Sequence, residues 1–111
     1  MNFEDWERER LDHAIGVLST ISPDGAPHAA PVQVWFEGDE LRFETEPETR
    51  KFRNIAREPR VAITVFGPPK WGVVLRGRAD VLTPGGPPGS REQAQLIVHP
   101  SSKVSWRRKE G

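Results

Sequence analysis

Turn-forming residues interrupt this chain at close intervals, and this feature limits the possible folds more than any other. The 111 residues include 11 prolines and 10 glycines. Several runs between them have the length and the β-branched or aromatic content of strands, so the sequence predicts short strands joined by turns. A chain of this length is expected to form a single domain, residues 1–111, around one modest core.

Three strands are expected in the first half of the chain, each separated from the next by a tight turn. They are Ala14–Ile21, Ala29–Glu37 and Leu41–Thr45. Residues 22–25 (SPDG) and 38–39 (GD) supply the turns, because proline fixes φ while Asp and Gly tolerate left-handed backbone angles. Consecutive strands joined in this way form an antiparallel meander.

The second half contains further strand-like runs, at Arg60–Phe66, Gly72–Leu82 and Lys103–Arg107. Gly77 lies inside the second of these runs, where a glycine is typical of a bulge or a sharp bend. The pattern of Arg91–Ile97 fits a short helix or a strand, and a break is expected after it at His99-Pro100. The total is therefore six or seven strands.

Two short helices complete the expected fold. The first spans Asn2–His13 and places Phe3, Trp6 and Leu11 on one face. The second is expected to be capped by Thr45 and to end before Pro59, because the residue before a proline avoids the helical region. The predicted fold class is mainly β, with six or seven antiparallel strands closed into a barrel or sandwich and one or two short helices.

Composition argues against several classes of function. Sixteen basic and sixteen acidic residues cancel, which disfavours a protein that binds nucleic acid by neutralising phosphates. There is no cysteine, and His13, His28 and His99 lack metal-binding spacing, so no metal site is expected. No apolar run approaches the roughly 20 residues of a membrane span, and the acidic N-terminus is unlike a signal peptide. We therefore expect a cytoplasmic protein with no membrane partner.

Basic residues cluster on the second predicted helix and just after it. They are Arg50, Lys51, Arg53, Arg57 and Arg60, against the single acid Glu58. Arginine forks and lysine point charges suit phosphate, and a helix start adds backbone N–H donors. A solvated helix face paired with Glu46 and Glu48 explains the same pattern equally well. Spacing alone leaves both interpretations open.

Four segments carry a resemblance to a known family. They are LSTISPDGAPHAAPV, the strand ending FET, TRKFRNIAREPRVAITV and VVLRGRADV, which lie between Leu18 and Val81. In order and spacing they resemble the pyridoxamine 5'-phosphate oxidase-like superfamily of flavin-binding split β-barrels. The resemblance implies a split barrel, a bound flavin or deazaflavin, and a homodimer with the cofactor at the subunit interface.

The resemblance also implies a set of cofactor contacts. The phosphate and ribityl side would be formed by the end of the third strand and the basic pair, at Glu44, Thr45, Arg50 and Lys51. The ring would lie along the second strand, at Pro31, Val32, Gln33 and Val34. Trp71 and Gly72, near the start of the long fifth strand, would reach the cofactor of the partner subunit.

Two departures from the superfamily pattern bear on the reaction. True pyridoxamine phosphate oxidases carry a glutamine near the position of Gly72 and a C-terminal Arg-His motif, which the tail SSKVSWRRKEG lacks. Synthesis of pyridoxal phosphate is therefore not expected.

The expected function is oxidoreduction of a small organic substrate by hydride transfer to or from the cofactor, with no catalytic side chain identified. The branch of the superfamily that uses the deazaflavin coenzyme F420 has similar short members, which favours F420 slightly over FMN. One alternative is a non-catalytic FMN-binding or electron-carrier protein of the same fold. A second is a small barrel that binds single-stranded nucleic acid, which the neutral charge disfavours.

Overall fold

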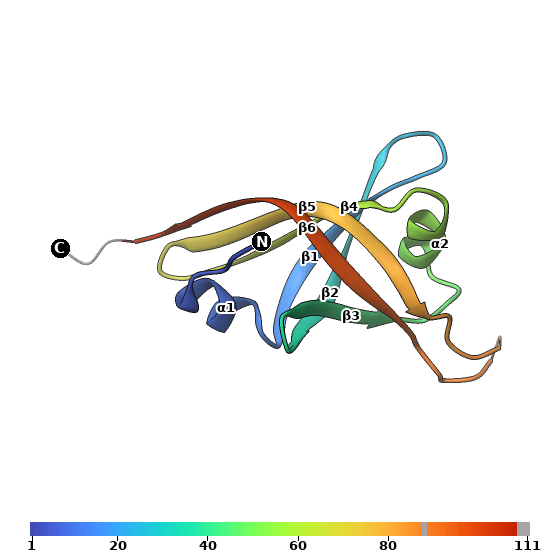
Figure 1. Cartoon of the computed structure of the whole chain (residues 1–111). Coiled ribbons are helices and arrows are strands. Elements are labelled where there is room, and N and C mark those ends of the chain that lie inside the picture. Colours follow the sequence, from blue (N-terminus) through green and yellow to red (C-terminus); the bar gives the residue numbers. More distant parts are fainter. Residues whose placement is uncertain (88, 109–111) are drawn as a thin grey trace.

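Six antiparallel strands close into a barrel in the computed structural model, which describes residues 1–87 and 89–108 (Figure 1). The elements in chain order are α1 (Asp5–Leu11), β1 (Ala14–Ile21), β2 (Pro27–Glu37), β3 (Glu40–Thr45), α2 (Arg50–Arg57), β4 (Arg60–Gly67), β5 (Trp71–Thr83) and β6 (Ala94–Arg107). Neighbouring strands follow the order β1-β2-β3-β6-β5-β4 around the barrel. The predicted mainly β, antiparallel barrel with two short helices is confirmed.

The β1–β2 turn shows why the chain reverses where the sequence predicts. The backbone N–H of Gly25, at φ 85°, donates to the carbonyl of Ser22 at 2.8 Å. The Asp24 carboxylate accepts the N–H of Ala26 at 3.0 Å. These contacts satisfy the backbone of the turn, so the strands on either side pair from Ile21↔Pro27 to Ala14↔Val34.

The break expected at His99-Pro100 is wrong, because β6 runs through these residues. Pro100 lies opposite Gly77 of β5, where the register between the two strands shifts. A bulge has room for a residue that cannot donate a ladder hydrogen bond, so the proline is tolerated inside the strand. Of the two possibilities for Arg91–Ile97, the strand is correct from Ala94 onward. The predicted bend at Gly77 is confirmed by the same register shift.

The cap predicted at Thr45 is also wrong. Thr45 is still paired with Ala94 as the last residue of β3, so its backbone belongs to a strand. The helix begins at Arg50, and its cap is Thr49, whose side chain accepts the N–H of Phe52. Its end before Pro59 is as predicted, with Glu58 as the last capping residue.

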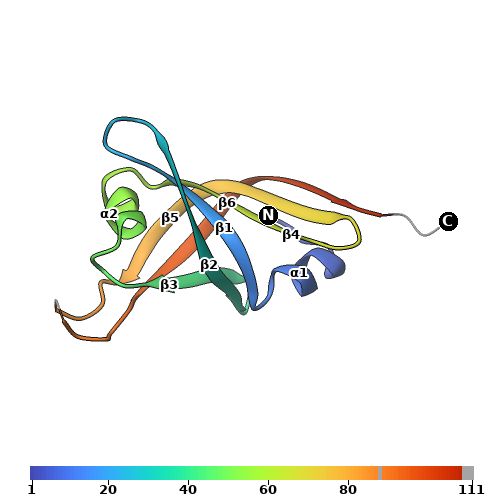
Figure 2. The same ribbon diagram turned by 180° about the vertical axis from the view of Figure 1, so that it is seen from behind.

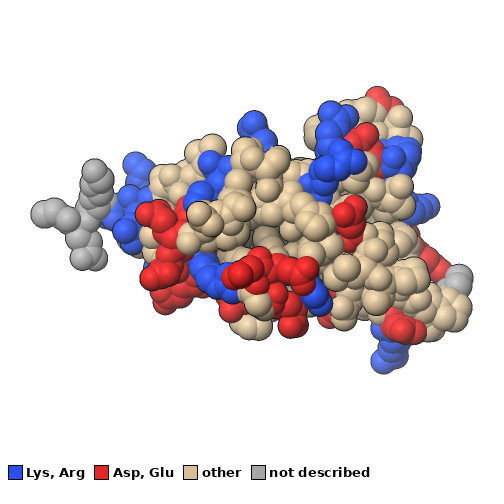
Figure 3. Space-filling model, viewed as in Figure 1, with Lys and Arg blue, Asp and Glu red and all other residues tan. Residues whose placement is uncertain are grey.

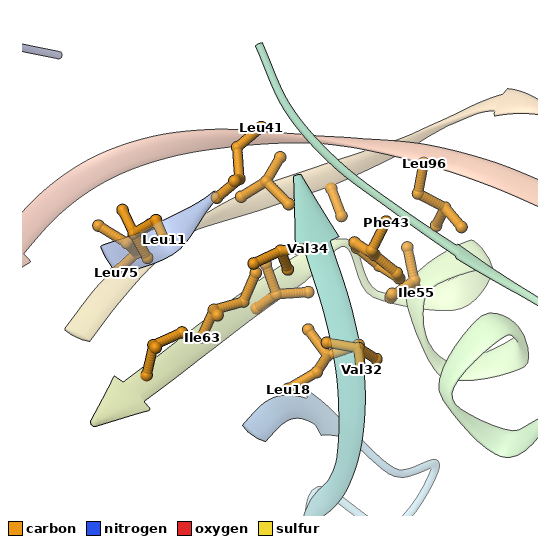
Figure 4. Close-up of a cluster of buried hydrophobic side chains, with 14 of the residues drawn as sticks. Leu11, Leu18, Val32, Val34, Leu41, Phe43, Ile55, Ile63, Leu75 and Leu96 are labelled. Atoms are coloured by element: carbon orange, nitrogen blue, oxygen red, sulfur yellow. The ribbon is translucent and has the colours of Figure 1, made fainter. Parts of the chain in front are cut away.

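The core is formed by alternate residues of the strands, and each end is closed by a helix residue (Figure 4). Leu18, Val34, Phe43 and Ile63 are fully buried inside the barrel. Figure 4 shows Ile55 of α2 entering this cluster at one end and Leu11 of α1 at the other. Both helices therefore use apolar residues to seal the barrel, and each also buries one polar residue, Glu7 in α1 and Asn54 in α2.

Charge is unevenly distributed although the net charge is zero. In Figure 3, Lys and Arg side chains gather over α2 and again at the opposite end, where β6 ends, and Asp and Glu gather over α1 and the β2–β3 turn. No helix in the described part of the chain is long and apolar enough to cross a membrane.

Candidate functional site

An opening between β2 and β3 positions the candidate site. The two strands pair only from Val34↔Phe43 to Glu37↔Glu40, so the first part of β2 has no strand partner on that side among the described residues. Beyond this point β3 continues alongside β6 through Glu44↔Gln95 and Thr45↔Ala94. Figure 2 shows β2 and β3 diverging from their shared turn, with α2 on the open side. The barrel is split here in its strand pairing, and the opening means this gap in the β2–β3 ladder, along which backbone groups of β2 have no β3 partner.

The start of α2 forms one wall of this opening. The hydroxyl of Thr45, which is buried, lies 3.0 Å from that of Thr49. Thr49 also donates to the carbonyl of Glu46 at 2.9 Å and accepts the N–H of Phe52 at 3.4 Å. The first backbone N–H groups of a helix have no partner within it, so those of Arg50 and Lys51 remain available to an anion.

Polar contacts at the other end of α2 hold the helix against the barrel. The buried amide of Asn54 donates to the hydroxyl of Thr20 on β1 at 3.0 Å. Arg57 donates to the carbonyl of Ile21 and, at 3.3 Å, to the amide oxygen of Asn54. A buried hydrogen bond of this kind fixes the helix because breaking it leaves polar groups unsatisfied. The start of α2 is therefore held in a defined position beside the opening.

Three cations of α2 have no acidic partner in residues 1–87 and 89–108. The side chains of Arg50 and Arg53 are exposed and that of Lys51 is half-buried. None of the ion pairs in the described chain includes these residues, and the first turn of the helix contains no acid. The interpretation in which Glu46 and Glu48 neutralise the cluster is thus not what the structure shows. The positive charge at the start of α2 remains available to a ligand.

The four candidate residues of β2 divide between the two faces of the strand. Val32 and Val34 point into the core, at 6% and 0% exposure, so only their backbone can face a ligand. Pro31 and Gln33 are exposed on the outer face, where Gln33 donates to the carbonyl of His13 at 3.5 Å. This alternation is the ordinary period of a strand. The outer face of β2 thus offers one flat apolar ring and one amide beside the opening.

Trp71 and Gly72 lie far from Arg50 and Lys51 within one chain. They begin β5 at the β4–β5 turn, at the end of the barrel opposite α2 (Figures 1 and 2). The Trp71 indole donates to the carbonyl of Pro68 at 3.1 Å, and the Arg10 guanidinium stacks 5.0 Å from its ring centre. A single copy of the chain therefore brings together the β2, β3 and α2 residues of the predicted site but not these two.

Some residues important to this region were missed by sequence reasoning. Thr49 caps α2, and a threonine directly before the run RKF was a usable indication of a helix start. Asn54 anchors the helix, but a polar residue on the buried face has no distinctive pattern. At the opposite end of the barrel, Trp106 lies over Gly72, where a Cβ would come too close to its ring atoms. This contact depends on the β5–β6 register, which local sequence does not reveal.

Glu58 follows α2, and its charge is set by Arg60. No group of three His, Cys, Asp or Glu residues that could hold a metal ion occurs in the described ranges. The pKa of Glu58 is lowered, mainly by the hydrogen bond from the Arg60 side chain, which favours the carboxylate. Glu58 lies at the far end of α2, so it does not neutralise the start of the helix. The arrangement suits binding of an anionic ligand more than proton transfer by a side chain.

Comparisons with known proteins agree with this geometry. A 5a,11a-dehydrotetracycline/5a,11a-dehydrooxytetracycline reductase of Streptomyces rimosus subsp. rimosus is 35% identical over 109 residues, covering 82% of this chain and 72% of the relative.

Among solved structures, an F420 reductase superposes with a TM-score of 0.78 at 24% identity, covering 93% of this chain and 98% of the other. A conserved hypothetical protein of Mycobacterium tuberculosis has a TM-score of 0.77 at 19% identity and covers 96% and 86%. At these identities the structural matches show the shared fold.

The sequence profile of one family covers most of the chain. The family described as pyridoxamine 5'-phosphate oxidase matches residues 4–96, from the start of α1 into β6. The matched segment includes the split between β2 and β3 and the whole of α2. The chain belongs to the pyridoxamine 5'-phosphate oxidase family.

Proposed function

We propose that this protein is an oxidoreductase that holds a flavin-type cofactor in the opening between β2 and β3 and uses it to reduce or oxidise a small organic molecule. The observation that carries the proposal is the unpaired edge of β2 facing the unneutralised cations at the start of α2. One wall suits a planar ring and the other suits a phosphate. These are the two parts that such a cofactor presents to a protein.

The described residues fit the phosphate of the cofactor. Arg50 and Lys51 would bind it, with the first-turn N–H groups of α2 as further donors. Thr45 would orient the Thr49 hydroxyl, and Glu44 lies exposed at the adjacent end of β3. The bound ring supplies the hydride chemistry, and the chain supplies binding and orientation. The backbone of Val32 to Val34 would lie along the ring and exclude water from one face.

The relatives support a redox function and the deazaflavin. The Streptomyces relative is named as a reductase, at an identity high enough to compare sites. A structural neighbour is named as an F420 reductase. We therefore place coenzyme F420 ahead of FMN as the cofactor of this chain.

A homodimer would complete the site. Five large apolar side chains point outward from the barrel wall, namely Ile15, Val17, Phe66, Val104 and Trp106, with exposures of 73%, 37%, 67%, 61% and 43%. Strand register places them in adjacent rows, because Val17 faces Thr64, Thr64 faces Val74 and Val74 faces Val104. A contiguous apolar face of this kind typically marks an interface. A second copy seated on it would bring its own Trp71 and Gly72 towards the first copy's opening.

Direct titration tests the cofactor assignment. The purified protein is titrated with F420 and with FMN, and binding is followed by the change in cofactor fluorescence. Reduced cofactor is then offered with a panel of enones and quinones. Tighter binding of F420 with turnover supports the proposal, whereas failure to bind either cofactor contradicts it. Binding without turnover of any acceptor would indicate the electron-carrier alternative.

Lys51 is expected to contribute strongly to cofactor affinity. Lys51→Ala should weaken binding by about 1–3 kcal/mol, the scale of a charge-assisted contact to phosphate. Arg91→Ala is the matched control, because Arg91 is an exposed cation outside the opening. Isothermal titration of both variants checks the difference. Equal losses would remove the phosphate assignment and leave only a general charge effect.

Phe66 is expected to control the oligomeric state. Phe66→Glu places a charge at the centre of the apolar face and should weaken dimerisation by about 2–4 kcal/mol, the range of an interface hot spot. Leu82→Glu is the control, since Leu82 is 45% exposed but lies near the other end of β5. Size-exclusion chromatography with light scattering gives the mass of each variant. A wild-type monomer would overturn the dimer proposal without affecting the cofactor titration.

A further inference from the structure

A second concave region lies on the outside of the barrel and shares no residue with the proposed cofactor site. This groove has a volume of about 590 Å³ and crosses β1, β4, β5 and β6 at the point where β5 and β6 bend. Its residues are Ser19, Thr20, Ile21, Pro27, Arg60, Val61, Ala62, Arg76, Gly77, Arg78, His99 and Ser101. Small side chains occupy the middle of the groove, because Ser19 pairs with Ala62 on the adjacent strand.

Three arginines dominate the walls of this groove. Ala62 lies opposite Arg76, and Arg60 lies directly opposite Arg78 in the β4–β5 register. Arg76 and Arg78 are separated by one residue of an extended strand, so their side chains leave the same face about 6–7 Å apart at the backbone. Several guanidinium groups therefore converge on one small volume.

Acidic residues balance this charge only in part within the described chain. Glu58 bonds Arg60 at 2.7 Å, and Asp80 lies 3.0 Å from His99. Arg76 and Arg78 form no ion pair with any residue in ranges 1–87 and 89–108. On the side of the groove towards β2, the lining residues are uncharged and include Pro27. Two guanidinium groups thus line a hollow without a carboxylate.

Arg60 and Arg78 lie directly opposite each other, where like charges repel. Glu58 offsets part of this repulsion, because it bonds Arg60 and is close enough to Arg78 for both arginines to lower its pKa. The exposed arginine side chains contribute nothing to the core. One carboxylate beside three guanidinium groups leaves positive charge in the groove for a bound anion.

We propose that this groove binds a small-molecule polyanion that carries phosphate or carboxylate groups. Arg76 and Arg78 would contact two acidic groups of one ligand, because guanidinium forks match either kind. Arg60 would add a third contact while it remains bonded to Glu58. The floor around Ser19 and Ala62 leaves space for the ligand between the arginines.

Titration of two simple probes against the full chain tests this site. Pyrophosphate and citrate are each added at constant ionic strength maintained with NaCl, and thermal unfolding and calorimetric binding are measured. We expect either probe to raise the melting temperature more than NaCl does. Arg76→Gln/Arg78→Gln should weaken probe binding by about tenfold or more, whereas Arg76→Lys/Arg78→Lys should retain part of it. Binding of pyrophosphate alone would assign a phosphate ligand, and binding of citrate alone a carboxylate ligand.

Controls separate this groove from the cofactor site and from general charge. In Arg50→Gln/Lys51→Gln, the probes should still raise the melting temperature by binding in the groove. Arg91→Gln should bind the probes as wild type does. The proposal fails if neither probe stabilises the protein beyond NaCl. It also fails if Arg76→Gln/Arg78→Gln binds the probes as tightly as wild type does. The third contradicting result is a loss of probe binding in Arg91→Gln as large as in Arg76→Gln/Arg78→Gln.

Discussion

Lys103→Met is expected to destabilise the fold by about 3 kcal/mol, because it leaves a buried carboxylate without its cation. Glu7 of α1 is completely buried, and its Oε1 accepts from Lys103 Nζ at 2.7 Å. The backbone N–H of Glu4 also donates to this oxygen, at 2.8 Å. Lys103 retains 22% side-chain exposure, which places the expected loss at the low end for a buried pair. Urea unfolding at neutral pH measures it.

The pH dependence of this loss follows from the pKa of Glu7. Burial opposes the charged form, but Lys103 and the other donors outweigh it and hold the pKa of Glu7 below its usual value. A lowered folded pKa gives stability that is present above the unfolded pKa, about 4.3, and disappears as the pH falls through the folded pKa. In Lys103→Met the burial of Glu7 is opposed only by its hydrogen bonds with Glu4 and Ser105, so acid should bring variant and wild type closer together.

Glu7→Gln/Lys103→Met is the control that separates lost charge from lost packing. Removing both charges should recover much of the stability that Lys103→Met loses, since the uncompensated carboxylate is gone. A double variant as unstable as Lys103→Met would show that the methylene packing of Lys103 matters more than its charge. No change in Lys103→Met itself would mean that water reaches Glu7.

Gly77→Val is expected to cost about 3 kcal/mol or more, at the upper end of overpacking effects. A Cβ at this position would meet the backbone of β6, including the carbonyl of His99 and the Cα of Pro100, the latter at 2.9 Å. These atoms are held by the β5–β6 ladder and cannot move away without opening the bulge. Thermal and urea unfolding should both show the loss, and binding of pyrophosphate in the adjacent groove should weaken.

Gly72→Ala is the matched control for this substitution. Its Cβ would also lie too close to a neighbour, but that neighbour is the ring of Trp106, which is 43% exposed. An exposed side chain can turn away, so the loss should stay below about 1 kcal/mol. Equal destabilisation by the two substitutions would show that the bulge is not the reason for the loss of stability in Gly77→Val.

Most of the strands could be predicted because their local patterns agree with their tertiary roles. The run Ala14–Ile21 has both β-branched content and a following turn, and its bounds match β1. The break at His99-Pro100 failed for the opposite reason. Proline usually ends a strand, but Pro100 is accommodated by the glycine opposite it, a partner more than twenty residues away in sequence. Local reasoning does not include a contact of that kind.

The candidate site could be predicted only in part. The basic pair Arg50-Lys51 was visible as an unbalanced cluster, and the structure shows no acid neutralising it in the described residues. The opening beside it depends on where β2 leaves β3, which no local pattern of β2 indicates. The distance of Trp71 from this opening depends on the length of the β4–β5 hairpin. The polyanion groove likewise arises from cross-strand register, since Arg60 and Arg78 are far apart in sequence.

The local cluster of cations around α2 has a kinetic consequence. With sixteen positive and sixteen negative residues, the chain has no net attraction for an anion at long range. Cations still face solvent around α2, so the local field beside this helix is positive (Figure 3). A phosphorylated cofactor approaching within a Debye length, about 8–10 Å, would be turned towards this helix before contact. Association should thus slow with added salt, as it does for proteins of high positive charge, although this chain remains neutral as a whole.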